Sequence, residues 1–112
     1  MKVLPRLVAG VAICLMGFMP FANGEQATQV QSYAGHLLTP LEFSAALTLW
    51  DKESGWRVDA RNGSHYGLCQ GRSKYMATAN YRQQVRWCIS YAQHRYGTMV
   101  KALAHWRQHG WH

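Results

Sequence analysis

The sequence predicts a small, mainly α-helical domain, and three observations support this fold class. Apolar residues recur at helical spacing in four segments, at about residues 25–38, 40–53, 81–96 and 99–106. No stretch alternates between apolar and polar residues over the length of a strand. The 112 residues contain no internal repeat and no linker long enough to separate two domains. We therefore expect one domain.

The first 24 residues have the features of an export signal. Two basic residues precede an almost wholly apolar run over 7–21, and Ala22-Asn23-Gly24 supplies small residues at a cleavage site. We predict a signal peptide at 1–24 and a secreted or periplasmic domain at 25–112, with no stable membrane anchor after cleavage. A retained anchor is the alternative, but the apolar run is shorter than the roughly 20 residues of a spanning helix.

The predicted domain contains two cysteines, Cys69 and Cys88, and an excess of basic residues. In an exported chain, an even number of cysteines favours a disulfide, here stabilising by about 3 kcal/mol in the chain-entropy model. Two buried free thiols are the alternative. The formal net charge of the whole sequence is +7, which favours an anionic partner such as cell-wall polymer, a membrane surface or nucleic acid.

The helix over 25–38 is short and amphipathic, and the next helix has the clearest start signal in the sequence. Its first residues, Thr39-Pro40-Leu41-Glu42, combine a capping threonine, a proline suited to the first helical position and a glutamate that completes a capping box. We expect this helix to run to about Glu53. Its apolar positions, which begin at Leu41 and end at Trp50, form a broad face for burial.

The segment from Ser54 to Lys74 is predicted to be a long loop. It contains four glycines and the turn dipeptide Asn62-Gly63. A loop of this length in a small domain is usually functional or disordered, and its aromatic residues argue against disorder. A single helical turn is expected in 73–80. The stripe that follows over 81–96 includes Cys88 and faces the core, so a bridge to Cys69 would tie the loop to this helix.

Glu53 is the candidate catalytic residue. It closes an apolar helix, and the glycine-rich loop follows it directly. Burying a charged carboxylate without a partner raises its pKa, and a raised pKa suits a general acid. Taken alone, however, the glutamate is better explained as a solvated residue in the last turn of an ordinary helix.

Four elements stand in a characteristic order: Glu53-Ser54-Gly55-Trp56, then Tyr66-Gly67-Leu68-Cys69-Gln70, then a helix with Tyr91 that ends at Arg95-Tyr96-Gly97, then Ala102-Leu103-Ala104-His105-Trp106. Behind an export signal, this order resembles the lytic transglycosylase domain of the lysozyme-like superfamily, to which goose-type lysozymes also belong. The resemblance covers roughly residues 40–112. It implies a small lysozyme-like helical domain with a glycine-rich active-site loop.

The resemblance implies cleavage of the β-1,4 bond between N-acetylmuramic acid and N-acetylglucosamine in peptidoglycan, without a cofactor. Glu53 matches the glutamate that protonates the glycosidic oxygen and later takes a proton from the 6-hydroxyl, which yields a 1,6-anhydro product. Ser54 matches the serine that supports the bound sugar. Gly67, Leu68 and Gln70 match the loop that lines the glycan groove.

Aromatic residues complete the predicted substrate site: Tyr66, Tyr91 and Trp106 as binding residues, with Trp56 and Tyr75 as further stacking candidates. Core packing is a competing explanation for these aromatic residues. The family often has a tyrosine where this sequence has Trp106, and an indole can only donate a hydrogen bond. Tyr91 would then supply the main hydroxyl near Glu53.

Alternative functions stay open at this point. Most glycosidases use two carboxylates, so the scarcity of acids favours the transglycosylase over a hydrolytic goose-type lysozyme, although Asp59 could hold a water. A non-catalytic basic protein that binds cell wall or membrane is a further alternative. Histidine and cysteine spacings support neither a metal site nor a cysteine protease, and no nucleic-acid motif is present. The expected partners are peptidoglycan glycan strands, and a secretion or conjugation apparatus is a further candidate partner.

Overall fold

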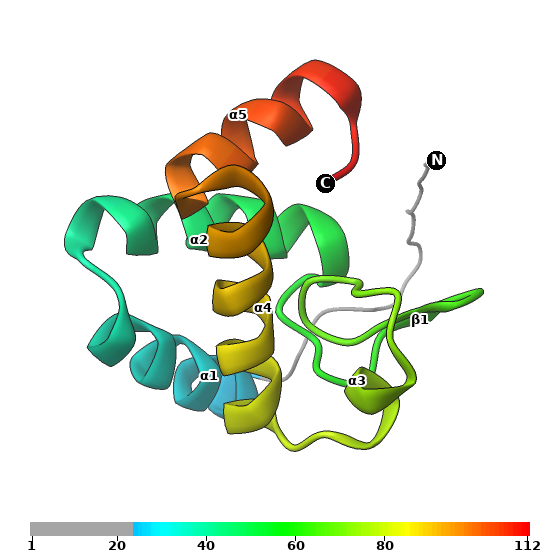
Figure 1. Ribbon diagram of the computed structural model, residues 1–112. Helices are drawn as coiled ribbons and strands as arrows, with labels where there is room; N and C mark the ends of the chain where they lie inside the picture. Colours follow the sequence, from blue (N-terminus) through cyan, green and yellow to red (C-terminus); the bar gives the residue numbers. More distant parts are fainter. Residues whose placement is uncertain (1–23) are drawn as a thin grey trace.

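The computed structural model describes residues 24–112, and helices make up most of this part of the chain (Figure 1). In chain order its elements are α1 (Gly24–Leu37), α2 (Pro40–Ser54), β1 (Arg61–Asn62), β2 (His65–Tyr66), α3 (Lys74–Thr78), α4 (Tyr81–Tyr96) and α5 (Met99–His109). The mainly α-helical class is confirmed. The predicted signal peptide falls outside the described residues, except for Gly24, and within them no helix is long and apolar enough to cross a membrane.

Local signals set the ends of α2 as the sequence predicts, with one difference. The Thr39 hydroxyl accepts a hydrogen bond from the backbone N–H of Glu42 at 3.3 Å, and Gly55 ends the helix with a φ of 61°. The prediction that Glu42 completes a capping box is wrong. Its carboxylate instead accepts from the backbone N–H groups of Met99 at 2.5 Å and Val100 at 3.3 Å. Glu42 therefore caps α5 across the domain, where the helix dipole favours a negative charge.

Helices α4 and α5 also follow their sequence signals. Asn80 and Gln83 form a reciprocal capping box at the start of α4. Gly97, with a φ of 92°, ends that helix in a conformation that L-residues rarely adopt. Thr98 then caps α5 by accepting from the backbone N–H of Lys101 at 3.0 Å. Two long helices can thus follow each other at a sharp corner.

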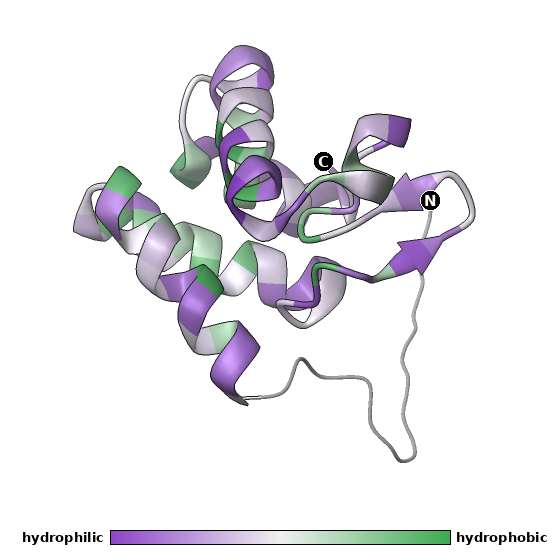
Figure 2. Cartoon of the chain, turned by 90° about the horizontal axis from the view of Figure 1, so that it is seen from below, coloured by the Kyte–Doolittle hydropathy of each residue, from purple (hydrophilic) through white to green (hydrophobic). Residues whose placement is uncertain are grey.

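The core lies between α2, α4 and α5, with α1 against α2 and α4. Figure 2 shows hydrophobic residues where the helices face one another, whereas the two short strands are hydrophilic. The fully buried large side chains include Leu49 and Trp50 of α2, Val85 of α4 and Met99 of α5. The prediction that Leu41 belongs to this core is wrong, since it is 70% exposed. The buried face of α2 begins one turn later, at Ala45.

The loop between α2 and α3 is held at several points. Cys69 and Cys88 form the predicted disulfide, with their Cα atoms 6.0 Å apart. Asn62-Gly63 makes the predicted turn, around which Arg61 pairs with Tyr66 in a small antiparallel hairpin. The sequence did not predict these strands, because two residues each are too few to show an alternating pattern.

Candidate functional site

Gln84 of α4 holds the loop in place, and the sequence interpretation did not include it. Its side chain is buried, with 2% exposure. The carboxamide oxygen accepts from the backbone N–H of Leu68 at 2.9 Å, and the nitrogen donates to the carbonyls of Val58 at 2.9 Å and Ala79 at 3.1 Å. One side chain therefore joins three parts of the loop region. The sequence does contain a signal for this role, because Gln84 lies four residues before Cys88 and therefore on the buried side of the predicted helix.

Two loop glycines allow this close packing. Gly67 has a φ of 74°, and a Cβ there would overlap the carboxamide of Gln84. At Gly71, a Cβ would lie 2.5 Å from the ring of Trp87. Any side chain at either position would force the loop away from α4.

Ser54 joins the loop to the end of α2. Its hydroxyl lies 2.6 Å from the carbonyl of Leu68, to which it can donate, and 3.2 Å from the carbonyl of Trp50. Because Ser54 follows Glu53 directly, this contact places the predicted catalytic residue beside the glycine-rich loop. Two predicted site residues, Ser54 and Leu68, are thus brought together.

The side chain of Glu53 is largely covered, with 15% exposure, and His112 lies against it. His112 Nε2 is 3.5 Å from Glu53 Oε2 and 2.9 Å from the backbone carbonyl of Cys69. A carbonyl only accepts, so Nε2 carries the proton and donates to Cys69. Figure 1 shows the chain after α5 turning back toward the end of α2. The sequence carries no signal for this contact, since a chain leaving a helix can take many directions.

His112 is neutral at pH 7 in this position. Burial lowers the pKa of its imidazole to about 4, because the charged form loses its hydration. The positive charges that His105, Arg95 and His65 carry when protonated act in the same direction. The contact with Glu53 is therefore made by a neutral ring and is not an ion pair at pH 7.

Two tyrosines of α4 lie near this contact. The ring of Tyr91 packs edge-on against His112 at 5.6 Å and stacks on Trp87 at 5.2 Å. The hydroxyl of Tyr96 is buried and has no hydrogen-bond partner within residues 24–112. Burial raises the pKa of Tyr96, the positive charge of Arg95 opposes this effect, and the negative charge of Glu53 adds to it. Tyr96 is thus a second residue near Glu53 that the site prediction did not include.

Several predicted site residues have structural contacts of their own. Leu68 is fully buried, so its side chain does not line a groove. The amide nitrogen of Gln70 donates to the carbonyls of Gly67 at 2.9 Å and Ala60 at 3.4 Å, so both of its N–H groups hold the loop. Tyr66 is half-buried, with the guanidinium of Arg61 over its ring at 4.9 Å. These contacts stiffen the loop next to Glu53.

The aromatic stacking candidates differ in exposure. Trp56 is 4% exposed and packs edge-on against Trp50 at 5.4 Å, so it is a core residue. Trp106 is half-buried beneath the ammonium group of Lys52 at 5.2 Å. Tyr75 is 49% exposed. It lines a surface depression of about 380 Å³ together with Gln83, Arg86, Trp87 and Ser90.

Glu53 differs from the other acids of the described chain. Asp59 is 80% exposed and pairs with Arg57 at 3.4 Å, Asp51 and Glu25 are exposed, and Glu42 caps α5. Within residues 24–112, no group of three or more potential ligands is arranged to hold a metal ion. The sequence matches no protein-family model, and no curated protein or solved structure is significantly similar to the chain. Glu53 and the residues around it are therefore the best candidates for a functional site.

Proposed function

We propose that the protein is a peptidoglycan lytic transglycosylase of the lysozyme-like type, with Glu53 as its acid and base. The observation that carries the proposal is the covered carboxylate of Glu53 at the end of α2, joined through Ser54 to the glycine-rich loop. A covered carboxylate beside a stiff loop provides what glycosidic cleavage requires: a proton donor in a water-poor site and a rigid wall to hold sugar.

The surroundings of Glu53 favour a mechanism with one carboxylate. Glycosidases that hydrolyse normally place a second carboxylate about 5 to 10 Å from the first. The remaining acids of residues 24–112 are exposed or engaged in capping a helix. Asp59, the alternative weighed from the sequence, is paired with Arg57 in solvent. A reaction in which the substrate supplies its own nucleophile fits this arrangement better than hydrolysis.

The proposed reaction balances with Glu53 alone. Glu53 donates its proton to the bridging oxygen as the bond from C1 of N-acetylmuramic acid to that oxygen breaks, releasing the 4-hydroxyl of N-acetylglucosamine. The 6-hydroxyl of the muramic residue then bonds to C1 and gives its proton to the carboxylate, which restores Glu53. The product is a 1,6-anhydro sugar, and no water is consumed.

Replacement of Glu53 by glutamine tests the proposal. The amide keeps the size of the side chain but cannot deliver a proton, so we expect turnover of purified peptidoglycan to fall by at least about 100-fold. Asp51→Asn is the matched control, since it removes an exposed acid of the same helix, and it should leave turnover unchanged.

Mass spectrometry of the muropeptides then identifies the reaction. Anhydro-ended products support the transglycosylase, whereas reducing ends would assign the protein to the hydrolytic goose-type lysozymes. Activity that survives in Glu53→Gln would remove Glu53 from the mechanism altogether.

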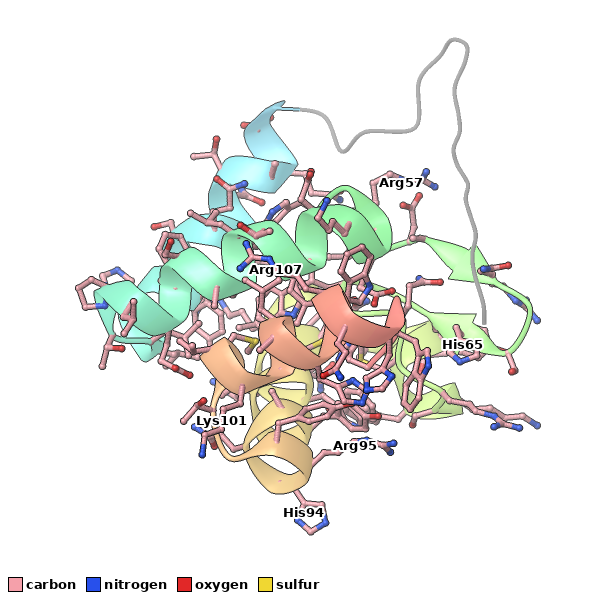
Figure 3. The ribbon with its side chains drawn as sticks, turned by 90° about the horizontal axis from the view of Figure 1, so that it is seen from above. Arg57, His65, His94, Arg95, Lys101 and Arg107 are labelled. Carbon is pink, nitrogen blue, oxygen red and sulfur yellow. A yellow bond between two sulfur atoms is a disulfide. The ribbon has the colours of Figure 1, made fainter. Side chains whose placement is uncertain are left out.

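A non-catalytic protein that binds cell wall or membrane is the second candidate. After Asp59 the sequence contains eight Lys and Arg residues and no acid. Of these basic side chains, Lys101 and Arg107 lie well apart from Arg57 in Figure 3. Binding to cell walls that is unaltered in Glu53→Gln, without any release of muropeptides by the wild type, would favour the second candidate.

A further inference from the structure

We propose that residues 110–112 form a strap that covers Glu53 at neutral pH and opens in acid to admit the glycan. The consequence for turnover rests on the proposed function, whereas the opening itself is a property of the protein alone. Three features carry the inference: the path of the strap, the position of His112 on the carboxylate, and the charges that surround its ring.

The strap leaves α5 by a sharp turn. Gly110 has a φ of 80°, which redirects the chain at the end of the helix. The backbone carbonyl of Trp111 then accepts from Nδ1 of His105 at 3.0 Å, and the two rings pack edge-on at 4.6 Å. His105 therefore anchors the strap from α5.

The position of His112 closes the way to the carboxylate. A general acid must come within hydrogen-bonding distance of the oxygen that it protonates. His112 spans from Glu53 Oε2 at 3.5 Å to the carbonyl of Cys69 at 2.9 Å, and its side chain is 6% exposed. The ring thus lies between the catalytic carboxylate and the loop that is proposed to hold the sugar. A glycan strand cannot reach this face of Glu53 until the ring moves.

The closed strap is held only marginally. Nδ1 of His112 is buried without a hydrogen-bond partner within residues 24–112, and an unsatisfied buried nitrogen is destabilising. Trp111 is 41% exposed. Besides these hydrogen bonds, Trp111 has ring contacts with His109 and Arg95, each at 5.7 Å, and Gly110 donates to the carbonyl of Trp106. A three-residue segment at the surface with this number of contacts can open without global unfolding.

Acid favours the open state because His112 binds a proton more readily after it leaves its site. Its ring faces Glu53 of α2, Tyr91 and Arg95 of α4, His105 of α5 and His65 of β2. Burial lowers its pKa to about 4 in the closed state, against about 6.5 in solvent. The free-energy preference for the closed state is therefore fully present above pH 6.5, and it decreases as the pH falls toward 4. Between pH 7.5 and 5, the ratio of open to closed strap should rise about 30-fold.

The first experiment needs no substrate. The His112 ring is titrated by NMR, with exposed His94 as an internal reference; Figure 3 shows His94 pointing away from the helices. We expect the midpoint of His112 to lie well below that of a solvated imidazole, and His105→Ala to move it upward, because the change removes both the anchor and a nearby charge. A midpoint like that of a free histidine in the wild type would show that the strap does not close.

The second experiment measures turnover. His112→Ala should raise turnover of peptidoglycan at pH 7.5, because the site is then open at every pH. It should reduce the ratio of turnover at pH 5 to that at pH 7.5 by up to about 30-fold, the gain that acid gives to the wild-type opening equilibrium. His105→Ala should change both quantities in the same direction, and His94→Ala should change neither.

The outcomes separate the two proposals. Turnover that falls in His112→Ala and in His105→Ala would overturn the strap, since it would make His112 a group that assists Glu53. Circular dichroism checks that each variant is folded. If neither variant folds, the NMR titration of His112 in the wild type still tests the strap. Glu53→Gln without loss of turnover refutes the proposed function but leaves the titration of His112 as a test of the strap.

Discussion

The buried carboxamide of Gln84 provides the sharpest test of how the loop is held. In Gln84→Met the side chain keeps a similar length but loses both hydrogen-bonding atoms. The backbone N–H of Leu68 and the carbonyls of Val58 and Ala79 then lose partners at 2.9, 2.9 and 3.1 Å. Leaving a buried polar group unsatisfied costs about 1 to 3 kcal/mol. Because the loop can relax partly toward water, we expect a loss of about 3 kcal/mol in the free energy of unfolding.

Urea unfolding followed by circular dichroism measures this loss. With a slope of about 1 kcal/mol per molar urea, suited to a small domain, the midpoint should fall by roughly 3 M. Gln93→Met is the matched control, since Gln93 is exposed on the same helix, and its effect should stay within about 0.5 kcal/mol. Amide hydrogen exchange should also become faster at Leu68. A loss below about 1 kcal/mol for Gln84→Met would refute the view that this side chain holds the loop.

Two further predictions concern the loop and the helices. Replacing Cys69 and Cys88 together by alanine removes the bridge between the loop and α4 and should lower the free energy of unfolding by about 3 kcal/mol. The melting temperature measured by calorimetry should therefore drop by more than about 10 °C. An unchanged melting temperature would contradict the role of the bridge. Gly35→Ala should stabilise α1 by about 0.5 to 1 kcal/mol in urea unfolding, because its Cβ would meet only the ring of Phe43 at ordinary contact distance, 3.8 Å. Gly97→Ala, at a φ of 92°, should have the opposite sign, and equal signs for the two changes would contradict the backbone argument.

Most of the secondary structure could be predicted because its signals are local. Thr39 and Pro40 start α2, and the apolar stripe with Cys88 defines α4; each signal acts within a few residues. The disulfide was predicted from the cysteine count and the export signal, and the pairing of Cys69 with Cys88 is confirmed. Glu42 shows the limit of such reasoning, because a local capping pattern did not reveal that its carboxylate caps a different helix.

In the candidate site too, some features follow from neighbouring residues in the sequence and others from contacts between distant elements. From the sequence alone, Glu53 could be placed at the end of an apolar helix, and the glycines beside it in a loop, because these features depend on neighbours along the chain. Its catalytic role was predicted only through the family resemblance. Only the tertiary structure decided what surrounds Glu53. His112 reaches it from 59 positions away and Gln84 fixes the loop from a different helix. Such contacts depend on how α2, α4 and α5 cross, and side-chain packing over the whole domain determines those crossings.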